Sequence, residues 1–251
     1  MLSTNYTGAL ATRNAIHANE TNCFSTLFAG QPAEHLAAGC SLFFQGDEAS
    51  HVFEVLEGTL RVCRIISDGR RIITGFLTGG DLIGVSLRRK YLYSVEAITP
   101  CTLRRMPRRR FETAVAQDDE LRPAVFARVC DEMAAAQDQM VLLSCKNAEE
   151  RLCSFFVKYM RQTSVLGERR MTIALPMSRQ DMADYLGLTI ETVSRTMTKL
   201  INKGVLSIES PGARHSITIE RPGLLEQLAG DSDEYEEAGR DLIVHGERRR
   251  H

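Results

Sequence analysis

The segment between Met177 and Gly204 constrains the fold of this chain more than any other feature of its sequence. Ser178 is a favoured N-cap residue, and Asp181 follows three positions later, where its side chain can bond back to the cap. Gly187 permits the left-handed backbone conformation in which many helices end. These signals predict a short helix that stops at a tight turn.

A second short helix is predicted directly after this turn. Thr189 is placed to cap the start of this helix, and Lys203 followed by Gly204 marks its end. At about 100° per residue, the apolar residues of this helix gather on one side; they are Val193, Met197 and Leu200. The opposite side is polar and consists of Glu191, Ser194, Arg195 and Thr198. The pattern predicts a helix-turn-helix with a polar outer face.

This polar face has the chemistry that reads base edges in DNA. An α-helix fits the major groove, where Arg can bond guanine O6 and N7 together and Glu can accept a hydrogen bond from cytosine N4. Glu191 and Arg195 lie one turn apart, so both can address neighbouring base pairs. The plain alternative is a solvated salt bridge, which contributes only a few tenths of a kcal/mol. The strand-like runs at 204–208 and 216–219 favour the DNA interpretation, because they complete a winged helix-turn-helix.

Several residues around this face are placed to contact the DNA backbone. Arg179 begins the first helix, and Arg214 lies in the turn between the two strand-like runs. The predicted backbone contacts are Ser178, Arg179, Thr189, Thr192, Thr198 and Arg214. Such contacts orient a protein on DNA but do not specify a sequence.

The charge of the chain changes along its length. The 251 residues carry a formal net charge of -1, but the segment 146–229 alone carries +3. A polyanion responds to the local field, so a basic segment can bind DNA within a nearly neutral chain. No run reaches the roughly 18 apolar residues of a membrane span, and the first twenty residues have no export signal. A cytoplasmic protein without a membrane partner is expected.

Residues 38–112 have the rhythm of short strands separated by glycine turns. The runs 52–56 and 59–65 alternate well enough to predict a hairpin across Glu57 and Gly58. A small antiparallel barrel is therefore expected. The arginine run at 104–105 and 108–110, broken by Pro107, is expected to form a solvated turn, with flanking DNA phosphate or polymerase as an alternative contact.

A helical pattern replaces the strand rhythm after about Phe111. Its apolar positions are spaced 3, 4, 3, 4, 3 and are Phe126, Val129, Met133, Ala136, Met140 and Leu143. This heptad seam predicts that two chains pair along the helix, although a lone amphipathic helix packed on its own barrel is the alternative. A second domain then opens near 145–146 with a helical run whose core anchors are Leu152, Phe155 and Phe156.

Three motifs of the chain occur together in one protein family. They are LEGTLRV at 56–62, GGDLIG at 79–84 and, after the seam helix, SRQDMADYLGLTIETVSRTMTKL at 178–200. In this combination the chain resembles the CRP/FNR superfamily of bacterial transcription regulators over roughly residues 38–225. The resemblance implies an α+β fold. Its parts would be an N-terminal cyclic-nucleotide-binding-like antiparallel β-roll, a long dimerisation helix and a C-terminal winged helix-turn-helix.

The motif ETVSR at 191–195 is similar to the FNR and FixK branch rather than to the cyclic-AMP receptor branch. The resemblance implies that Arg195 reads a guanine, Glu191 its cytosine partner and Ser194 an outer thymine. It further implies a homodimer bound to double-stranded DNA at a palindrome resembling TTGAT-N4-ATCAA. RNA polymerase would be the partner, and microaerobic, denitrification or nitrogen-fixation genes the targets. The sequence contains no Walker loop, HExxH or G-x-S-x-G motif, so an enzyme is not expected.

The expected organisation has five parts. They are a mobile N-terminal segment at 1–20, a β-roll sensor-like domain at 21–112, a dimerisation helix at 113–145, a winged helix-turn-helix DNA-binding domain at 146–229 and a mobile charged tail at 230–251.

The β-roll lacks the residues that hold a cyclic nucleotide in related proteins. Val85 follows the GGDLIG turn, and the stretch at 90–94 offers no Arg-Ser pair for a phosphate. Cyclic-AMP binding is not expected, although the cations at 88–90 keep that alternative open. A receptor for another small effector, such as a nucleotide, haem or nitric oxide adduct, is the second hypothesis for this domain.

The seven cysteines include no CxxC pair, so neither a zinc ribbon nor a redox dithiol is expected. Cys101 resembles the barrel ligand of the FNR iron-sulfur cluster, but the N-terminal cysteines of that cluster are absent. No cofactor and no metal are therefore expected. Cys23 and Cys101 are the candidate redox residues. The other cysteines considered, Cys63, Cys130, Cys145 and Cys153, are expected to be small buried hydrophobes.

Overall fold

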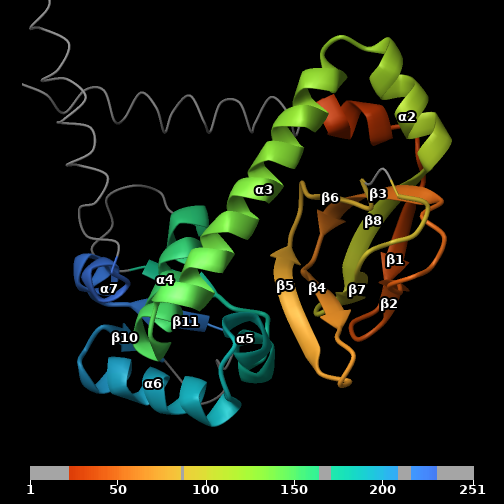
Figure 1. Cartoon of the computed structure of the whole chain (residues 1–251). Helices are drawn as coiled ribbons and strands as arrows, with labels where there is room; N and C mark the ends of the chain where they lie inside the picture. Colours follow the sequence, from red (N-terminus) through yellow and green to blue (C-terminus); the bar gives the residue numbers. More distant parts are fainter. Residues whose placement is uncertain (1–22, 86–87, 164–170, 209–215, 231–251) are drawn as a thin grey trace, which may run out of the picture. The chain divides into compact units, whose positions relative to one another are not determined.

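The computed structural model describes residues 23–85, 88–163, 171–208 and 216–230. The chain divides into two compact units, Met1–Gln137 and Asp138–His251, called here the N-terminal and the C-terminal unit. Figure 1 shows their helices and strands. The predicted mobile segment at 1–20, the predicted tail at 230–251 except Gly230, and the predicted phosphate contact Arg214 lie outside the described residues.

The N-terminal unit is a β-roll of two antiparallel sheets. One sheet has the strand order β1-β8-β3-β6 and the other has the order β2-β7-β4-β5. The strands are β1 (Ala33–Leu36), β2 (Ser41–Phe43), β3 (His51–Glu57), β4 (Leu60–Ile65), β5 (Arg71–Leu77), β6 (Leu82–Ile83), β7 (Ser94–Ala97) and β8 (Cys101–Pro107). The predicted β-roll is therefore confirmed.

Apolar side chains from both sheets form one core cluster of this unit. Phe53 and Leu103 come from the first sheet, and Leu60 and Val95 come from the second. Tyr91 joins them, and its ring stacks on that of Phe43 with ring centroids 3.7 Å apart. Aromatic stacking of this kind stabilises a core beyond the burial of apolar surface. The buried side chains from the two sheets fill the interior of the roll.

The predicted hairpin across Glu57 and Gly58 is wrong. Strand β3 pairs with β6 and β8, whereas β4 pairs with β5 and β7, so the two strands belong to different sheets. The cause lies at Gly58, which has a φ of 95° and passes so close to Pro100 that an added Cβ would meet its carbonyl oxygen at 2.5 Å. The chain uses this glycine to cross between sheets instead of folding back on itself.

Two helices, α2 (Arg108–Gln117) and α3 (Leu121–Cys145), follow the roll. The predicted single helix at 113–145 is thus corrected: helix begins at Arg108 and is interrupted at 118–120. The Asp118 carboxylate accepts hydrogen bonds from the backbone N–H groups of Glu120, at 2.8 Å, and Leu121, at 3.0 Å, and so starts a new helix. The arginines at 108–110 form the first turn of α2 and those at 104–105 lie in β8, so the predicted turn is wrong, although Arg109 and Arg110 are exposed.

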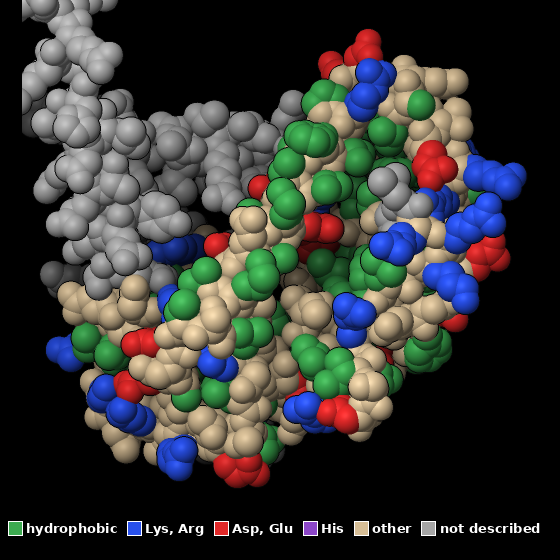
Figure 2. Space-filling view, in the orientation of Figure 1, with side chains coloured by type: hydrophobic (Ala, Val, Ile, Leu, Met, Phe, Trp, Pro, Cys, Tyr) green, Lys and Arg blue, Asp and Glu red, His purple; other side chains and the backbone are tan. Residues whose placement is uncertain are grey.

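The predicted seam residues lie exposed along α3. Phe126 is 71% exposed, Met133 59% and Met140 62%, and Figure 2 shows hydrophobic side chains following the same helix. Val129, Ala136 and Leu143 are also exposed. Within the N-terminal unit, the seam residues from Phe126 to Ala136 are therefore exposed rather than buried against the β-roll.

The C-terminal unit combines helices with a small sheet of order β10-β11-β9. Its elements are α4 (Ala148–Thr163), β9 (Met171–Ala174), α5 (Arg179–Leu186), α6 (Ile190–Asn202), β10 (Leu206–Ser207), β11 (Ser216–Ile219) and α7 (Pro222–Leu228). The predicted anchors Leu152, Phe155 and Phe156 are all buried. Strand β9 was not predicted from the sequence.

This unit begins earlier than the expected boundary at 145–146. The last turns of α3 belong to it because Gln139 donates a hydrogen bond to the Tyr185 carbonyl oxygen at 2.8 Å. Arg151 also reaches the Leu143 carbonyl oxygen at 2.9 Å. Side-chain bonds to backbone carbonyls thus attach the end of the seam helix to the helix-turn-helix.

No helix in the described part of the chain is long and apolar enough to span a membrane. Over the same residues, no group of three or more His, Cys, Asp or Glu side chains has the proximity needed to hold a metal ion.

Candidate DNA-recognition surface

Helix α5 begins with the capping box that the sequence predicts. The Ser178 hydroxyl oxygen accepts a hydrogen bond from the Asp181 backbone N–H at 3.1 Å. In return the Asp181 carboxylate accepts from the Ser178 backbone N–H at 3.1 Å and from its hydroxyl at 2.7 Å. Asp181 is buried, so the box is shielded from water and fixes the helix start.

The turn after α5 is held on both sides. Gly187 has a φ of 63°, as predicted for a left-handed C-cap, and its N–H donates to the Ala183 carbonyl oxygen. Arg151 donates to the Leu186 carbonyl oxygen at 3.0 Å and to the Lys146 carbonyl oxygen at 2.8 Å. A cation that bonds the last carbonyls of a helix also offsets its dipole, so this turn has a defined geometry.

Helix α6 presents the two faces that the sequence predicts. Val193, Met197 and Leu200 are buried. Glu191, Arg195 and Thr198 are exposed, and Ser194 is half-buried. The Thr189 hydroxyl oxygen accepts from the Thr192 backbone N–H at 3.2 Å and caps the start of the helix. Thr196 is buried as well, which makes the apolar face wider than predicted.

The alternative reading of Glu191 and Arg195 as a salt bridge finds no support. Within the described residues no ion pair joins these two side chains. The backbone N–H of Glu191 and the Thr189 hydroxyl hold the pKa of the Glu191 carboxyl below its ordinary value. Glu191 is therefore an ionised acceptor at neutral pH, as a contact to cytosine N4 requires.

The predicted backbone contacts surround this face. Arg179 lies at the start of α5, and its Nη1 donates to the Ser194 hydroxyl oxygen at 3.4 Å. The Thr198 hydroxyl donates to the Ser194 carbonyl oxygen at 3.0 Å, and the hydroxyls of Thr189 and Thr192 lie 3.1 Å apart. Residues from two helices thus meet at one surface.

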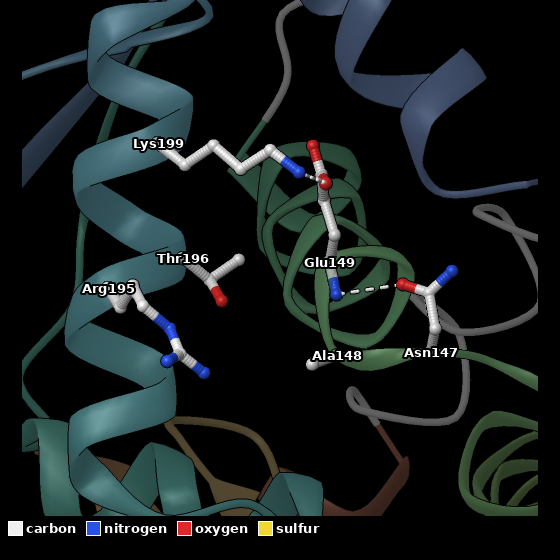
Figure 3. A pocket seen from close by; sticks show the side chains of 6 residues that line it. All are labelled: Asn147, Ala148, Glu149, Arg195, Thr196 and Lys199. Carbon is white, nitrogen blue, oxygen red and sulfur yellow. Dashed lines mark hydrogen bonds and ion pairs between the residues drawn. The ribbon is translucent and has the colours of Figure 1, made fainter.

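A hollow of about 360 Å³ beside this surface was not predicted. It is lined by Asn147, Ala148, Glu149, Arg195, Thr196 and Lys199, and Figure 3 shows the side chains of α6 reaching toward the start of α4. Glu149 forms ion pairs with both Lys199 and Lys203. The spacing of these lysines can be seen in the sequence, but their pairing with Glu149 cannot. Glu149 lies about fifty residues away in the chain, so no local pattern indicates the contact.

The cysteines divide by environment. Cys63, Cys101 and Cys153 are buried, Cys130 is half-buried, and Cys145 is exposed, which corrects the expectation that it is buried. Burial raises the pKa of Cys101, whose thiol donates to the carbonyl oxygens of Thr99 at 3.1 Å and Thr59 at 3.5 Å. A protonated, buried thiol is a poor redox sensor, so the surroundings of Cys101 do not support that role. Cys23 is half-buried at the start of a helical turn.

Cyclic-nucleotide binding by the β-roll would need a cation that holds the phosphate. None of the Lys and Arg side chains in its described residues is buried, and the cations at 88–90 are exposed. Arg61 and Arg71 are directed at the Glu96 carboxylate, with N–O distances of 2.8 and 3.8 Å. Arg104 likewise pairs with the buried Glu54 carboxylate at 3.5 Å, so these three arginines of the described β-roll already have carboxylate partners.

The fold and the surface on α5 and α6 define a winged helix-turn-helix protein. Residues 33–118 match the family of cyclic nucleotide-binding domains, and residues 150–228 match the family of Crp-like helix-turn-helix domains. The chain therefore belongs to the CRP/FNR family of transcription regulators, in its FixK-like branch.

Individual relatives support this assignment. The chain is 36% identical over 195 residues to the nitrogen fixation regulation protein FixK of Bradyrhizobium diazoefficiens, across 78% of this chain and 81% of FixK. It is 36% identical over 203 residues to the transcriptional activator protein FnrL of Cereibacter sphaeroides, across 78% and 80% of the two chains. The structure of FixK2 from Bradyrhizobium japonicum has a TM-score of 0.72 and 31% identity over 79% of this chain and 96% of FixK2. These relatives and the Crp-like domain make the chain a DNA-binding transcription regulator.

Proposed function

We propose that this protein binds, as a homodimer, to a DNA palindrome resembling TTGAT-N4-ATCAA. The observation that carries the proposal is the shared exposed face of Glu191 and Arg195, which are not paired with one another. A guanidinium and a carboxylate that lie one turn apart without pairing match a guanine and a cytosine on neighbouring base pairs. Arg195 would read the guanine, Glu191 the cytosine and Ser194 the outer thymine.

The residues around this face would hold the helix on the duplex. Arg179 is exposed at the start of α5, where it can reach a phosphate, and Ser178, Thr189, Thr192 and Thr198 offer hydroxyl groups. Arg214, which lies in the sequence between β10 and β11, would add a further contact. These groups set register and general affinity, whereas the three base-reading residues set sequence preference.

The exposed seam of α3 supports the homodimer. Its heptad spacing suits a second copy of the same helix, because equivalent apolar positions face one another in a parallel pair. Such a dimer would present its two recognition helices about 34 Å apart, which is one turn of the duplex. Twofold symmetry in the protein then requires a palindrome in the DNA.

The dimer would act in the cytoplasm by recruiting RNA polymerase to microaerobic, denitrification or nitrogen-fixation genes. The names of FixK and FnrL support a role of this kind. No resident cofactor is needed in this account. If instead the β-roll binds a small effector, operator affinity will depend on that effector, and colourless protein purified without additives will bind weakly.

Fluorescence anisotropy with the purified full chain tests the proposal. A labelled duplex containing TTGAT-N4-ATCAA should bind at least about a thousandfold more tightly than a scrambled duplex of equal composition, measured at one stated salt concentration. The same titration under reducing and oxidising conditions tests thiol control. Equal affinity for both duplexes, in every redox condition, would rule out the proposed operator.

A further inference from the structure

Two lysines extend the cationic row of the recognition helix. Lys199 and Lys203 follow Arg195 by one and two turns of α6 and its C-cap, so the three side chains leave the same side of the helix. Lys199 is 55% exposed and Lys203 is 40% exposed. Neither lysine belongs to the base-reading or backbone-contact sets described above.

Both lysines are occupied by a single carboxylate. Glu149 Oε1 lies 2.6 Å from Lys203 Nζ, and Glu149 Oε2 pairs with Lys199 Nζ. Figure 3 shows the Lys199 side chain extended across the hollow toward Glu149. The two hydrogen bonds lower the pKa of the Glu149 carboxyl, so that it is ionised at neutral pH.

The position of Glu149 is fixed by the start of α4. The Asn147 side-chain oxygen accepts hydrogen bonds from the backbone N–H groups of Glu149, at 3.0 Å, and Glu150, at 3.2 Å. Only 20% of the Glu149 side chain is exposed. The carboxylate is therefore held at the edge of the face that carries Arg195, where a DNA backbone would approach α6.

A carboxylate and a DNA phosphate present the same kind of acceptor to an ammonium group. A lysine that neutralises a phosphate releases condensed counterions, which strengthens binding at low salt. A lysine that must first leave Glu149 gains less from the same contact, because one ion pair is exchanged for another. In the free protein, the Glu149 carboxylate thus already occupies the two lysines that could bind a phosphate.

We propose that Glu149 is an internal competitor of the DNA backbone, which holds Lys199 and Lys203 in the free protein and gives them up to a phosphate on binding. This inference rests on the proposed DNA-binding function. It assigns Lys199 and Lys203 to backbone contact and makes Glu149 a residue that lowers affinity for all sequences alike. With a lower sequence-independent affinity for DNA, the base contacts of Glu191 and Arg195 would decide which site is bound.

The substitution Glu149→Gln tests the inference, with anisotropy titrations on the operator and on the scrambled duplex over a range of salt concentrations. Exposed ion pairs are weak, so binding to both duplexes should tighten by only about fivefold. The ratio of the two affinities should stay constant, and the slope of log affinity against log salt should steepen by about one. Circular dichroism melting shows whether each variant is folded.

Two controls separate competition from a general change of charge. Glu150→Gln removes the same charge one residue away, where the carboxylate accepts from the Asn147 backbone N–H at 2.8 Å, and should tighten binding less than Glu149→Gln. The double change Lys199→Gln and Lys203→Gln should weaken binding to both duplexes. In that background, the further change Glu149→Gln should tighten binding no more than Glu150→Gln does.

Three results would overturn the inference. They are weaker binding by Glu149→Gln, an equal gain from Glu150→Gln, and a gain from Glu149→Gln that persists in full without the two lysines. The scrambled duplex also keeps this test distinct from the operator assignment. If the wild-type chain bound both duplexes equally, the proposed operator would fail, yet the lysine competition would still be measurable.

Discussion

Arg179 and Ser194 join the two helices of the DNA-recognition surface, because Arg179 Nη1 donates a hydrogen bond to the Ser194 hydroxyl oxygen at 3.4 Å. Arg179 is the first residue of α5, whereas Ser194 lies within α6. One guanidinium that is proposed to contact a phosphate therefore also contacts a side chain that is proposed to read a base. General affinity and the thymine preference are thus expected to be coupled through this pair.

The substitution Arg179→Ala should weaken binding to every DNA sequence and reduce the salt slope by about one, because a phosphate contact is lost. It should also relax discrimination at the outer thymine, since the Ser194 hydroxyl loses a donor that orients it. Anisotropy titrations on the operator, a thymine-substituted operator and a scrambled duplex measure both effects. Arg64→Ala, an exposed change in the β-roll, serves as control. An unchanged salt slope for Arg179→Ala would contradict the phosphate role.

Gly58→Ala and Gly69→Ala test the crossing between the two sheets. Both glycines have a positive φ, of 95° and 84°, so each alanine costs about 1 kcal/mol or somewhat more in backbone strain. At Gly58 the new Cβ would also meet the Cys101 sulfur at 2.6 Å, whereas Gly69 has nothing within 4 Å. Overpacking should therefore cost Gly58→Ala about 1–3 kcal/mol more. Urea unfolding of the full chains decides this, and equal losses would contradict the crossing geometry.

The helix-turn-helix could be predicted from the sequence because its determinants are local. Ser178 and Asp181 bond each other across three residues, and Gly187 and Thr189 act on the backbone beside them. Such signals have the same meaning in any fold that contains a helix end. The face of α6 also follows from its own spacing, which is why Glu191 and Arg195 were placed correctly on the exposed side.

The features that could not be predicted from the sequence depend on contacts between residues far apart in the chain. Strands β3 and β4 are adjacent in the chain and alternate like a hairpin, but the close contact of Gly58 with Pro100 separates them into two sheets. Strand β9 pairs only with β11, across more than forty residues. The pairing of Glu149 with Lys199 and Lys203 has the same character. Tertiary contacts decide these features, and no local pattern encodes them.

The dimer seam predicts a strong effect of Met133→Glu. Met133 is 59% exposed in the single chain and would be buried in the pair. Loss of about 1.5 kcal/mol of burial from each chain should raise the dimer dissociation constant about a hundredfold. Sedimentation equilibrium measures this constant. Ala134→Glu, an exposed change of equal charge outside the seam, should leave the dimer intact. Equal dissociation of both variants, or of neither, would contradict pairing along this seam.

The contact between Arg195 and a guanine is the central claim, and Arg195→Ala measures it most directly. Wild-type and variant affinities are compared on the operator and on an operator whose guanine is replaced in both half-sites. The wild-type chain should prefer the guanine by about 1–3 kcal/mol per contact, and Arg195→Ala should lose that preference while its affinity for scrambled DNA changes little. If the variant lost the same affinity on operator and scrambled duplexes and kept the guanine preference, Arg195 would not read a base.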